Sequence, residues 1–280
     1  MKNDHTFWTA PVQREEPIDG WSLLDGRRRL ELPSREAATR RLLRGSGAVL
    51  LAEPGHGEFV PIPAVESLPA SHRSRFTTLL GRRAAVLALV GGPLLAAAFA
   101  TRRLELLGMG GGAVGLALVL GIDAFLLGRS QSALEDRLRF LHWCEADDGV
   151  RRLRVHVLAF LVTIGGGQFV AQELLGGMPP LWEALGLVYD RVSIVEGWRF
   201  LTGPLLHYDV AHFVLNGVLL LMLSGFVRAA APRLGVAAFV LACVAAAFAQ
   251  YSLGGRAFDN FGGISGGVYA WFGLAAGRGD

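Results

Sequence analysis

The sequence predicts an all-α polytopic membrane protein, and three observations lead to that fold class. Apolar residues make up 52 % of the 280 and charged residues only 18 %, whereas about a quarter of a soluble domain is charged. The apolar excess lies after residue 83, in six blocks of 17 or 18 residues without Asp, Glu, Lys or Arg. A helix needs about 17–25 such residues to cross a bilayer. Basic residues are concentrated in alternate connections between the blocks, as expected for a membrane protein whose cytoplasmic segments are rich in Lys and Arg.

The first element, residues 1–83, has ordinary polar composition and is predicted to be a small cytoplasmic α+β module. Ser34 is a candidate N-cap for a helix over residues 35–44, which Gly45-Ser46-Gly47 would end. Residues 48–52 and 58–62 are predicted strands on either side of a Pro-Gly-His-Gly turn. We expect no active site in this module, and His56 is interpreted as a turn residue.

The apolar blocks follow in order. Residues 84–128 form an additional transmembrane hairpin, and residues 129–152 form a cytoplasmic linker with an amphipathic helix over 130–143. Four further spans complete the chain. The six blocks are residues 84–101, 106–122, 155–171, 210–227, 234–250 and 261–277. A soluble all-helical core is the alternative, but buried soluble helices are usually shorter and amphipathic.

The distribution of arginines orients the spans. Arginines precede the first span, fill the linker, separate the fourth and fifth spans and follow the sixth. All of these segments lie on one side if the N-terminus is cytoplasmic, the side where Lys and Arg accumulate. Arg102 and Arg103 are exceptions to this rule, because they lie in a connection on the non-cytoplasmic side in this orientation. The first 20 residues contain no apolar signal-peptide region, so we expect insertion to begin at residue 84.

Several function classes find no support in the sequence. The net charge of +3 is explained by the positive-inside pattern, so we expect no nucleic-acid partner. Cys144 lies in the predicted cytoplasmic linker and Cys243 inside a predicted span; neither position suits a disulfide, and two cysteines make no disulfide framework. The segment 142–148 contains His, Cys, Glu and Asp but lacks the second ligand pair of a zinc site. We expect neither metal nor cofactor.

Two short patterns carry chemistry. His212 and Asn216 lie four residues apart in the fourth span, so they share a helix face and can donate hydrogen bonds toward one point. Gly263-Ile264-Ser265-Gly266 opens the sixth span, where free N–H groups favour a developing negative charge. Either pattern alone is also compatible with helix packing. Because both spans begin at the outer surface, we expect the three polar residues to meet there.

The runs EGWRFLTGPLLHYDVAHFVLN and GISGGVYAWFG, separated by one span, resemble the rhomboid family of bacterial intramembrane serine proteases. The resemblance covers residues 153–280, which would be the first four of six core helices in a rhomboid-like helical bundle. It implies a Ser–His dyad that cleaves peptide bonds in or near transmembrane segments of other proteins, at the bacterial inner membrane.

The resemblance also assigns roles to single residues. Ser265 would be the nucleophile, within the motif that Gly263 and Gly266 complete, and His212 and Asn216 would be the oxyanion donors. Tyr269 would pack against the catalytic histidine. The residues that would brace the outer loop are Trp198, Glu196, Arg199 and His207.

One departure from the family concerns the general base, a histidine on the sixth core helix. Residues 266–280 contain no histidine, so the chain resembles a rhomboid truncated after its fourth core helix. We expect these 280 residues alone to be inactive. Two alternatives stay open. One is a rhomboid-like protein that binds membrane clients without cutting them. The other is a transporter or channel, against which stand the lack of an inverted repeat and the scarcity of intramembrane charges.

Overall fold

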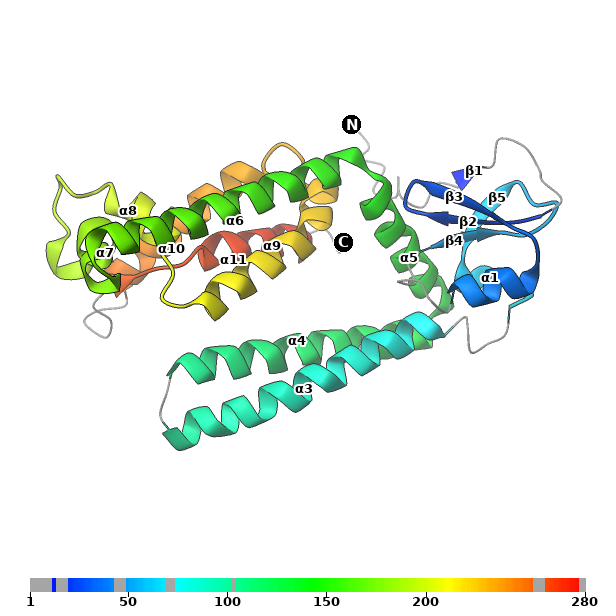
Figure 1. Ribbon diagram of the computed structural model, residues 1–280, viewed down its shortest axis with the longest axis horizontal. Helices are drawn as coiled ribbons and strands as arrows, with labels where there is room; N and C mark the ends of the chain where they lie inside the picture. The colour runs from blue at the N-terminus through cyan, green and yellow to red at the C-terminus, as the bar shows by residue number, and fades with distance from the viewer. Residues whose placement is uncertain are drawn as a thin grey trace. The chain divides into compact units, whose positions relative to one another are not determined.

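A computed structural model describes residues 12–13, 20–42, 49–68, 74–101, 104–253 and 260–276. The chain divides into two compact units, Met1–Asp147 and Asp148–Asp280. The first contains a small sheet and a helical hairpin, and the second contains the helices that carry the two chemical motifs (Figure 1). The predicted stop at residues 45–47 lies outside the described residues.

The first unit begins with a five-stranded antiparallel sheet in the order β1-β5-β4-β2-β3. The tightest connection is the two-residue loop between β2 and β3, where Gly26 has φ +56°, a conformation that glycine adopts without strain. Strands β4 and β5 lie where the sequence predicted them. The strands are β1 (Val12–Gln13), β2 (Trp21–Asp25), β3 (Arg28–Leu32), β4 (Leu50–Ala52) and β5 (Glu58–Pro61).

Helix α1 (Arg35–Leu42) packs on one face of this sheet (Figure 1). Ser34 caps it as predicted, since its hydroxyl accepts a hydrogen bond from the Ala37 N–H at 3.3 Å. Ala38 and Leu42 are buried against Trp21, Leu23 and Leu51 in one apolar cluster. The N-terminal region is therefore an α+β module with a core of its own.

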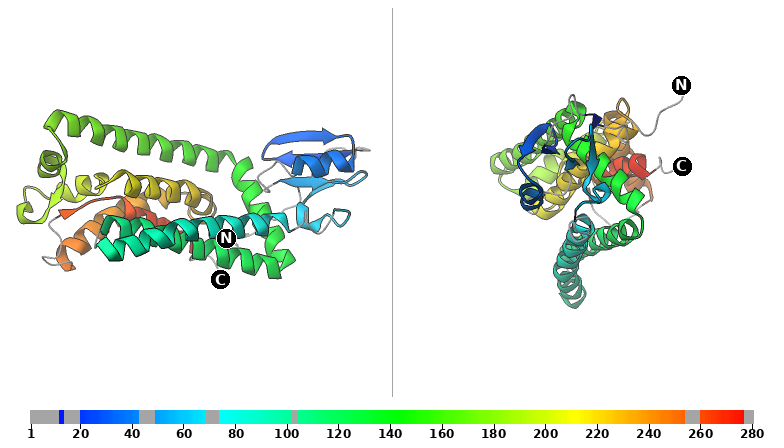
Figure 2. Two further views of the ribbon diagram at one scale, coloured as in Figure 1. Left: turned by 60° about the horizontal axis from the view of Figure 1, so that its bottom comes forward. Right: turned by 90° about the vertical axis from the view of Figure 1, so that its right-hand side faces the viewer.

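Helices α3 (Arg75–Thr101) and α4 (Leu104–Arg129) form the hairpin, and they lie side by side in every view (Figure 2). Two glycines permit their close approach. A Cβ on Gly91 would lie 2.9 Å from Ala113 Cβ, and one on Gly110 would lie 2.6 Å from the backbone nitrogen of Leu95. Small residues at the crossing are typical of helix pairs in membranes, where close van der Waals packing drives association.

Helix α5 (Gln131–Ala146) occupies the predicted linker and begins at the N-cap Ser130. Its apolar face is buried against the hairpin, where Leu134 and Leu138 cluster with residues of α3 and α4. Arg137 donates to Asp123 of α4 at 2.8 Å. Its other contacts reach the sheet module, since Arg139 pairs with Glu58 of β5 at 3.5 Å. Helix α5 therefore ties the hairpin to the module.

The second unit consists of four long or medium helices and the connection between α6 and α9, which we name the outer connection after the orientation predicted from the sequence. Helices α6 (Asp148–Leu175), α9 (Val210–Ala230), α10 (Gly235–Leu253) and α11 (Ser265–Ala276) run alongside one another (Figures 1 and 2). Their common core includes Leu161, Leu220, Ile264 and Trp271. The outer connection holds α7 (Met178–Leu185), β6 (Leu187–Val188), the short 3-10 helices η3 (Tyr189–Arg191) and η4 (Gly203–Leu205), and α8 (Arg199–Thr202).

Five of the described helices are long and apolar enough to cross a membrane, and five of the six predicted spans overlap them, three of these lying wholly within. The spans are Arg75–Thr101, Gly110–Arg129, Asp148–Leu175, Val210–Ala230 and Gly235–Leu253. The sixth predicted span contains α11, whose described part has 12 residues. The chain is a multi-pass α-helical membrane protein with a small N-terminal sheet module.

Candidate active site

The segment before α11 places Ser265 at the first position of that helix. Strand β7 (Asn260–Phe261) pairs with β6 of the outer connection, and a turn through Gly263 leads into the helix. Gly263 has φ +100°, and a Cβ there would lie 2.5 Å from Cε1 of His212. Only glycine therefore fits between the segment and the His212 ring. This close approach brings the turn before Ser265 against α9.

Ser265 itself is partly exposed, and its hydroxyl makes no hydrogen bond within the described residues. The preceding residue, Ile264, is fully buried, and its carbonyl accepts from the N–H groups of Gly267 and Val268 at 3.0 and 3.2 Å. The hydroxyl thus stands free at a helix N-terminus, where the unpaired N–H groups and the helix dipole favour negative charge.

The other glycines of this region serve close packing. A Cβ on Gly266 would lie 2.6 Å from Ala246 Cβ, and one on Gly267 would lie 2.3 Å from the Phe239 ring, both in α10. In the segment before α11, a Cβ on Gly262 would lie 2.3 Å from the Trp182 ring of α7. These glycines therefore allow the start of α11 and the residues before it to pack closely against α10 and α7.

The start of α9 supplies the second group of polar residues. Asp209 caps the helix, because its carboxylate accepts from the His212 N–H at 2.7 Å. The Asn216 side-chain amide donates to Nε2 of His207 across 3.4 Å, and both side chains are buried. The His207 and His212 rings meet edge to face, with centroids 5.4 Å apart. His207, His212 and Asn216 thus form one contiguous group.

His207 is neutral in this group. Burial, together with the neighbouring His212, lowers its pKa from 6.5 to about 4, because the charged form loses its hydration. Its Nδ1 lies 3.2 Å from the carbonyl of Leu205. That carbonyl can only accept, so Nδ1 carries the proton and Nε2 is left as the acceptor for Asn216.

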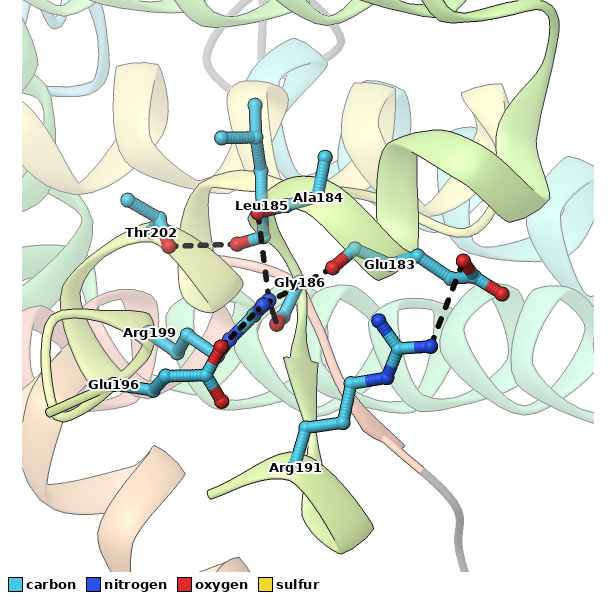
Figure 3. Close-up of polar contacts among 8 residues, drawn as sticks. All are labelled: Glu183, Ala184, Leu185, Gly186, Arg191, Glu196, Arg199 and Thr202. Atoms are coloured by element: carbon cyan, nitrogen blue, oxygen red, sulfur yellow. Dashed lines mark hydrogen bonds and ion pairs between the residues drawn. The ribbon is translucent and has the colours of Figure 1, made fainter. Parts of the chain in front are cut away.

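The outer connection is fastened by Arg199, as Figure 3 shows. Its guanidinium is buried and donates to the backbone carbonyls of Gly186 at 2.7 Å and Glu183 at 3.1 Å, and to the Glu196 carboxylate at 3.1 Å. The Thr202 hydroxyl donates to the Leu185 carbonyl at 2.6 Å. The three backbone carbonyls, of Glu183, Leu185 and Gly186, lie at the C-terminal end of α7. The last carbonyls of a helix have no partners within the helix. A cation at this end also suits the helix dipole.

The outer connection then contacts the nucleophile segment. Tyr208 stacks on Trp182 with ring centroids 4.8 Å apart. Its hydroxyl donates to Asn260 of β7, with the side-chain and backbone oxygens at 2.9 and 3.1 Å. Because Trp182 also covers Gly262, the position of α7 determines the position of the segment that presents Ser265.

The model of the rhomboid domain family matches residues 195–279. This chain contains a rhomboid domain. Over 117 residues it is also 32 % identical to the rhomboid protease GlpG of Klebsiella pneumoniae, in strain 342 and in a strain of subspecies pneumoniae. The match covers 40 % of this chain and 40 % of each relative. No solved structure matches.

The rhomboid domain contains all the site residues that the sequence predicted. The contacts join His212 to Gly263 and Asn216 to His207, and they join Arg199 to Glu196 and, through a cation–π contact at 4.7 Å, to Trp198. Tyr269 stands apart: it is 75 % exposed. Among the described residues, no cluster of three or more His, Cys, Asp or Glu side chains could hold a metal ion.

Sequence reasoning missed Gln168, a polar residue inside the apolar span of α6. Its side-chain amide donates to the His207 carbonyl at 2.8 Å and accepts from the His207 N–H at 2.9 Å. The signal was available in the sequence, because a polar side chain in a membrane span marks a functional or packing role. The partner of that side chain was hidden, since His207 lies 39 residues further along the chain.

Proposed function

We propose that this chain supplies the nucleophile and the oxyanion donors of an intramembrane serine endopeptidase. The observation that carries the proposal is the position of Ser265, free at the N-terminus of α11, on a turn whose Gly263 lies against His212. The names of the curated relatives, both rhomboid proteases, support it. Its substrates would be transmembrane proteins, cut in or near their spans.

The proposed chemistry is acyl transfer without a cofactor. The Ser265 hydroxyl attacks the carbonyl of the scissile bond, and a general base takes its proton. The negative charge on the former carbonyl oxygen is stabilised by His212, Asn216 and the N–H groups at the start of α11. The leaving amine takes the proton, and water then hydrolyses the acyl-enzyme.

The base in this proposal is a histidine from outside the 280 residues, as the family resemblance implies. Burial leaves His207 neutral, and its Nε2 already accepts from Asn216. His212 lies on Gly263, and its imidazole serves as a donor in the proposal. We further propose that the protein lies in the bacterial inner membrane with a cytoplasmic N-terminus, from the placement of its arginines.

The test uses the product of the full open reading frame that encodes these residues, beside the 280-residue chain. Each is reconstituted with a model transmembrane substrate, and His212→Ala and Asn216→Ala are compared with the wild type for cleavage and for thermal stability. Loss of one donor should lower turnover by about 10²- to 10³-fold while the fold persists. The 280-residue chain alone should not cleave. Variants that lose stability but keep their turnover when folded would refute the oxyanion role, whereas a folded wild-type product that binds the substrate without cleaving it would favour a client-binding protein.

A further inference from the structure

Both polar atoms of the Gln168 side-chain amide form hydrogen bonds to the backbone of one residue, His207. Its Nε2 donates to the His207 carbonyl at 2.8 Å, and its Oε1 accepts from the His207 N–H at 2.9 Å. The Nε2 atom also approaches Met178 Sδ at 3.8 Å, a weak contact. Gln168 lies in the span of α6, where an unpaired amide would be costly. Two good hydrogen bonds therefore fix the His207 backbone relative to α6.

The position of this backbone determines what the His207 ring can do. The Leu205 carbonyl lies 3.2 Å from Nδ1 and selects the tautomer with the proton on that nitrogen. Nε2 is then an acceptor, and it faces the Asn216 amide at 3.4 Å. Only the NH₂ group of that amide can donate to it, so the opposite orientation of the amide, with its oxygen against Nε2, is unfavourable.

We infer that Gln168 is a positioning residue, which holds His207 so that its ring fixes the Asn216 amide in the orientation of a hydrogen-bond donor. The inference rests on the proposed function for the role of Asn216 as an oxyanion donor. The chain of contacts runs from α6 through the loop at His207 to α9. An oxyanion donor lowers the barrier only if its N–H is aimed before the reaction begins, and supporting side chains provide that aim.

The matched control is Gln172. It has the same side chain on the same helix, one turn further on, and its side chain makes no hydrogen bond within the described residues. Gln168→Leu removes both hydrogen bonds to His207, whereas Gln172→Leu removes none. Gln168→Glu keeps the acceptor for the His207 N–H but loses the donor to the carbonyl, so its effect should be intermediate.

The first readout is the tautomer of His207 in the 280-residue chain, measured by long-range ¹H–¹⁵N NMR with His207→Gln for assignment. The wild type and Gln172→Leu should carry the proton on Nδ1, and Gln168→Leu should show a mixture of tautomers and a shifted Asn216 amide resonance. Identical spectra for Gln168→Leu and the wild type would overturn the inference. This readout needs no catalytic activity.

The second readout is the rate at which a fluorophosphonate labels Ser265 in the product of the full open reading frame. Gln168→Leu should lower that rate by about 10-fold or more, since complete loss of a donor costs about 10²- to 10³-fold, while Gln172→Leu should not change it. Equal rates for Gln168→Leu and a labelled wild type would also overturn the inference. An unlabelled wild type would refute the proposed function, and the NMR readout would then decide on Gln168 by itself.

Discussion

Replacing Arg199 by Met tests how the outer connection is held. The change keeps most of the buried stem but removes the guanidinium and its bonds to the Gly186 and Glu183 carbonyls at 2.7 and 3.1 Å. Hydrogen bonds to a charged group contribute about 1.5–3 kcal/mol each. Two of them predict a loss of about 3–6 kcal/mol in the local stability of α7 and the loop after it.

Arg191→Met is the matched control. Arg191 also pairs with Glu183, but at 3.6 Å, with side chains 50 % and 64 % exposed. Exposed ion pairs of this kind are worth about 0–1 kcal/mol, so this variant should behave like the wild type. Arg199→Lys should be intermediate, because one ammonium cannot reach the carbonyls that the planar guanidinium reaches.

Limited proteolysis of the loop between α7 and α8 measures the effect. Local opening that is easier by about 3 kcal/mol raises the open population by about 100-fold. The cleavage rate of Arg199→Met should rise by that order, with the rate of Arg191→Met unchanged. Equal rates for the two methionine variants would refute the reasoning that Arg199 fastens the end of α7.

Three further predictions concern other parts of the chain. Because burial lowers the pKa of His207 from 6.5 to about 4, only the unfolded state gains a proton between these values. Stability should therefore fall by up to about 3 kcal/mol as the pH drops from 6.5 to 4. Thermal melting across that range checks this, and His207→Gln should flatten the profile. Gly110→Val should destabilise the hairpin by about 1–3 kcal/mol, since a Cβ there would lie 2.6 Å from backbone. Gly111→Val, with nothing within 4 Å of its Cβ, should be tolerated in the same melting assay. Reporter fusions after Arg129 and Arg233 should be cytoplasmic and a fusion after Gly176 external, and an external reading at Arg233 would contradict the proposed orientation.

The membrane spans could be predicted because length and hydropathy are properties of one continuous segment. Their ends could not be predicted in the same way. Helix α3 begins at Arg75, ahead of the apolar block at Ala84, since hydropathy marks the hydrocarbon core and a helix can extend beyond it. The hairpin of β2 and β3 was missed, although Asp25-Gly26 is a recognised hairpin signal. The arginines of its edge strand obscured the alternation of apolar residues.

In the candidate site, too, the local features could be predicted from the sequence and the contacts between elements could not. The HxxxN and GxSG spacings predicted that α9 and α11 carry the polar residues, because spacing on one helix determines which side chains share a face. The contacts between different helices and loops could not be predicted from the sequence. Neither the role of Gly266 and Gly267 in packing on α10 nor the bonds of Gln168 to His207 follow from local sequence. They depend on which helices meet, and that is a property of the fold.

The most direct test of the account is covalent labelling of Ser265. The product of the full open reading frame, folded in detergent or lipid, is treated with a fluorophosphonate and the modified residue is identified by mass spectrometry. A nucleophilic serine reacts only when a neighbouring base takes its proton. We predict modification at Ser265, abolished in Ser265→Ala and strongly reduced in Asn216→Ala. A folded product that is unmodified at Ser265, or modified equally at other serines, would contradict it.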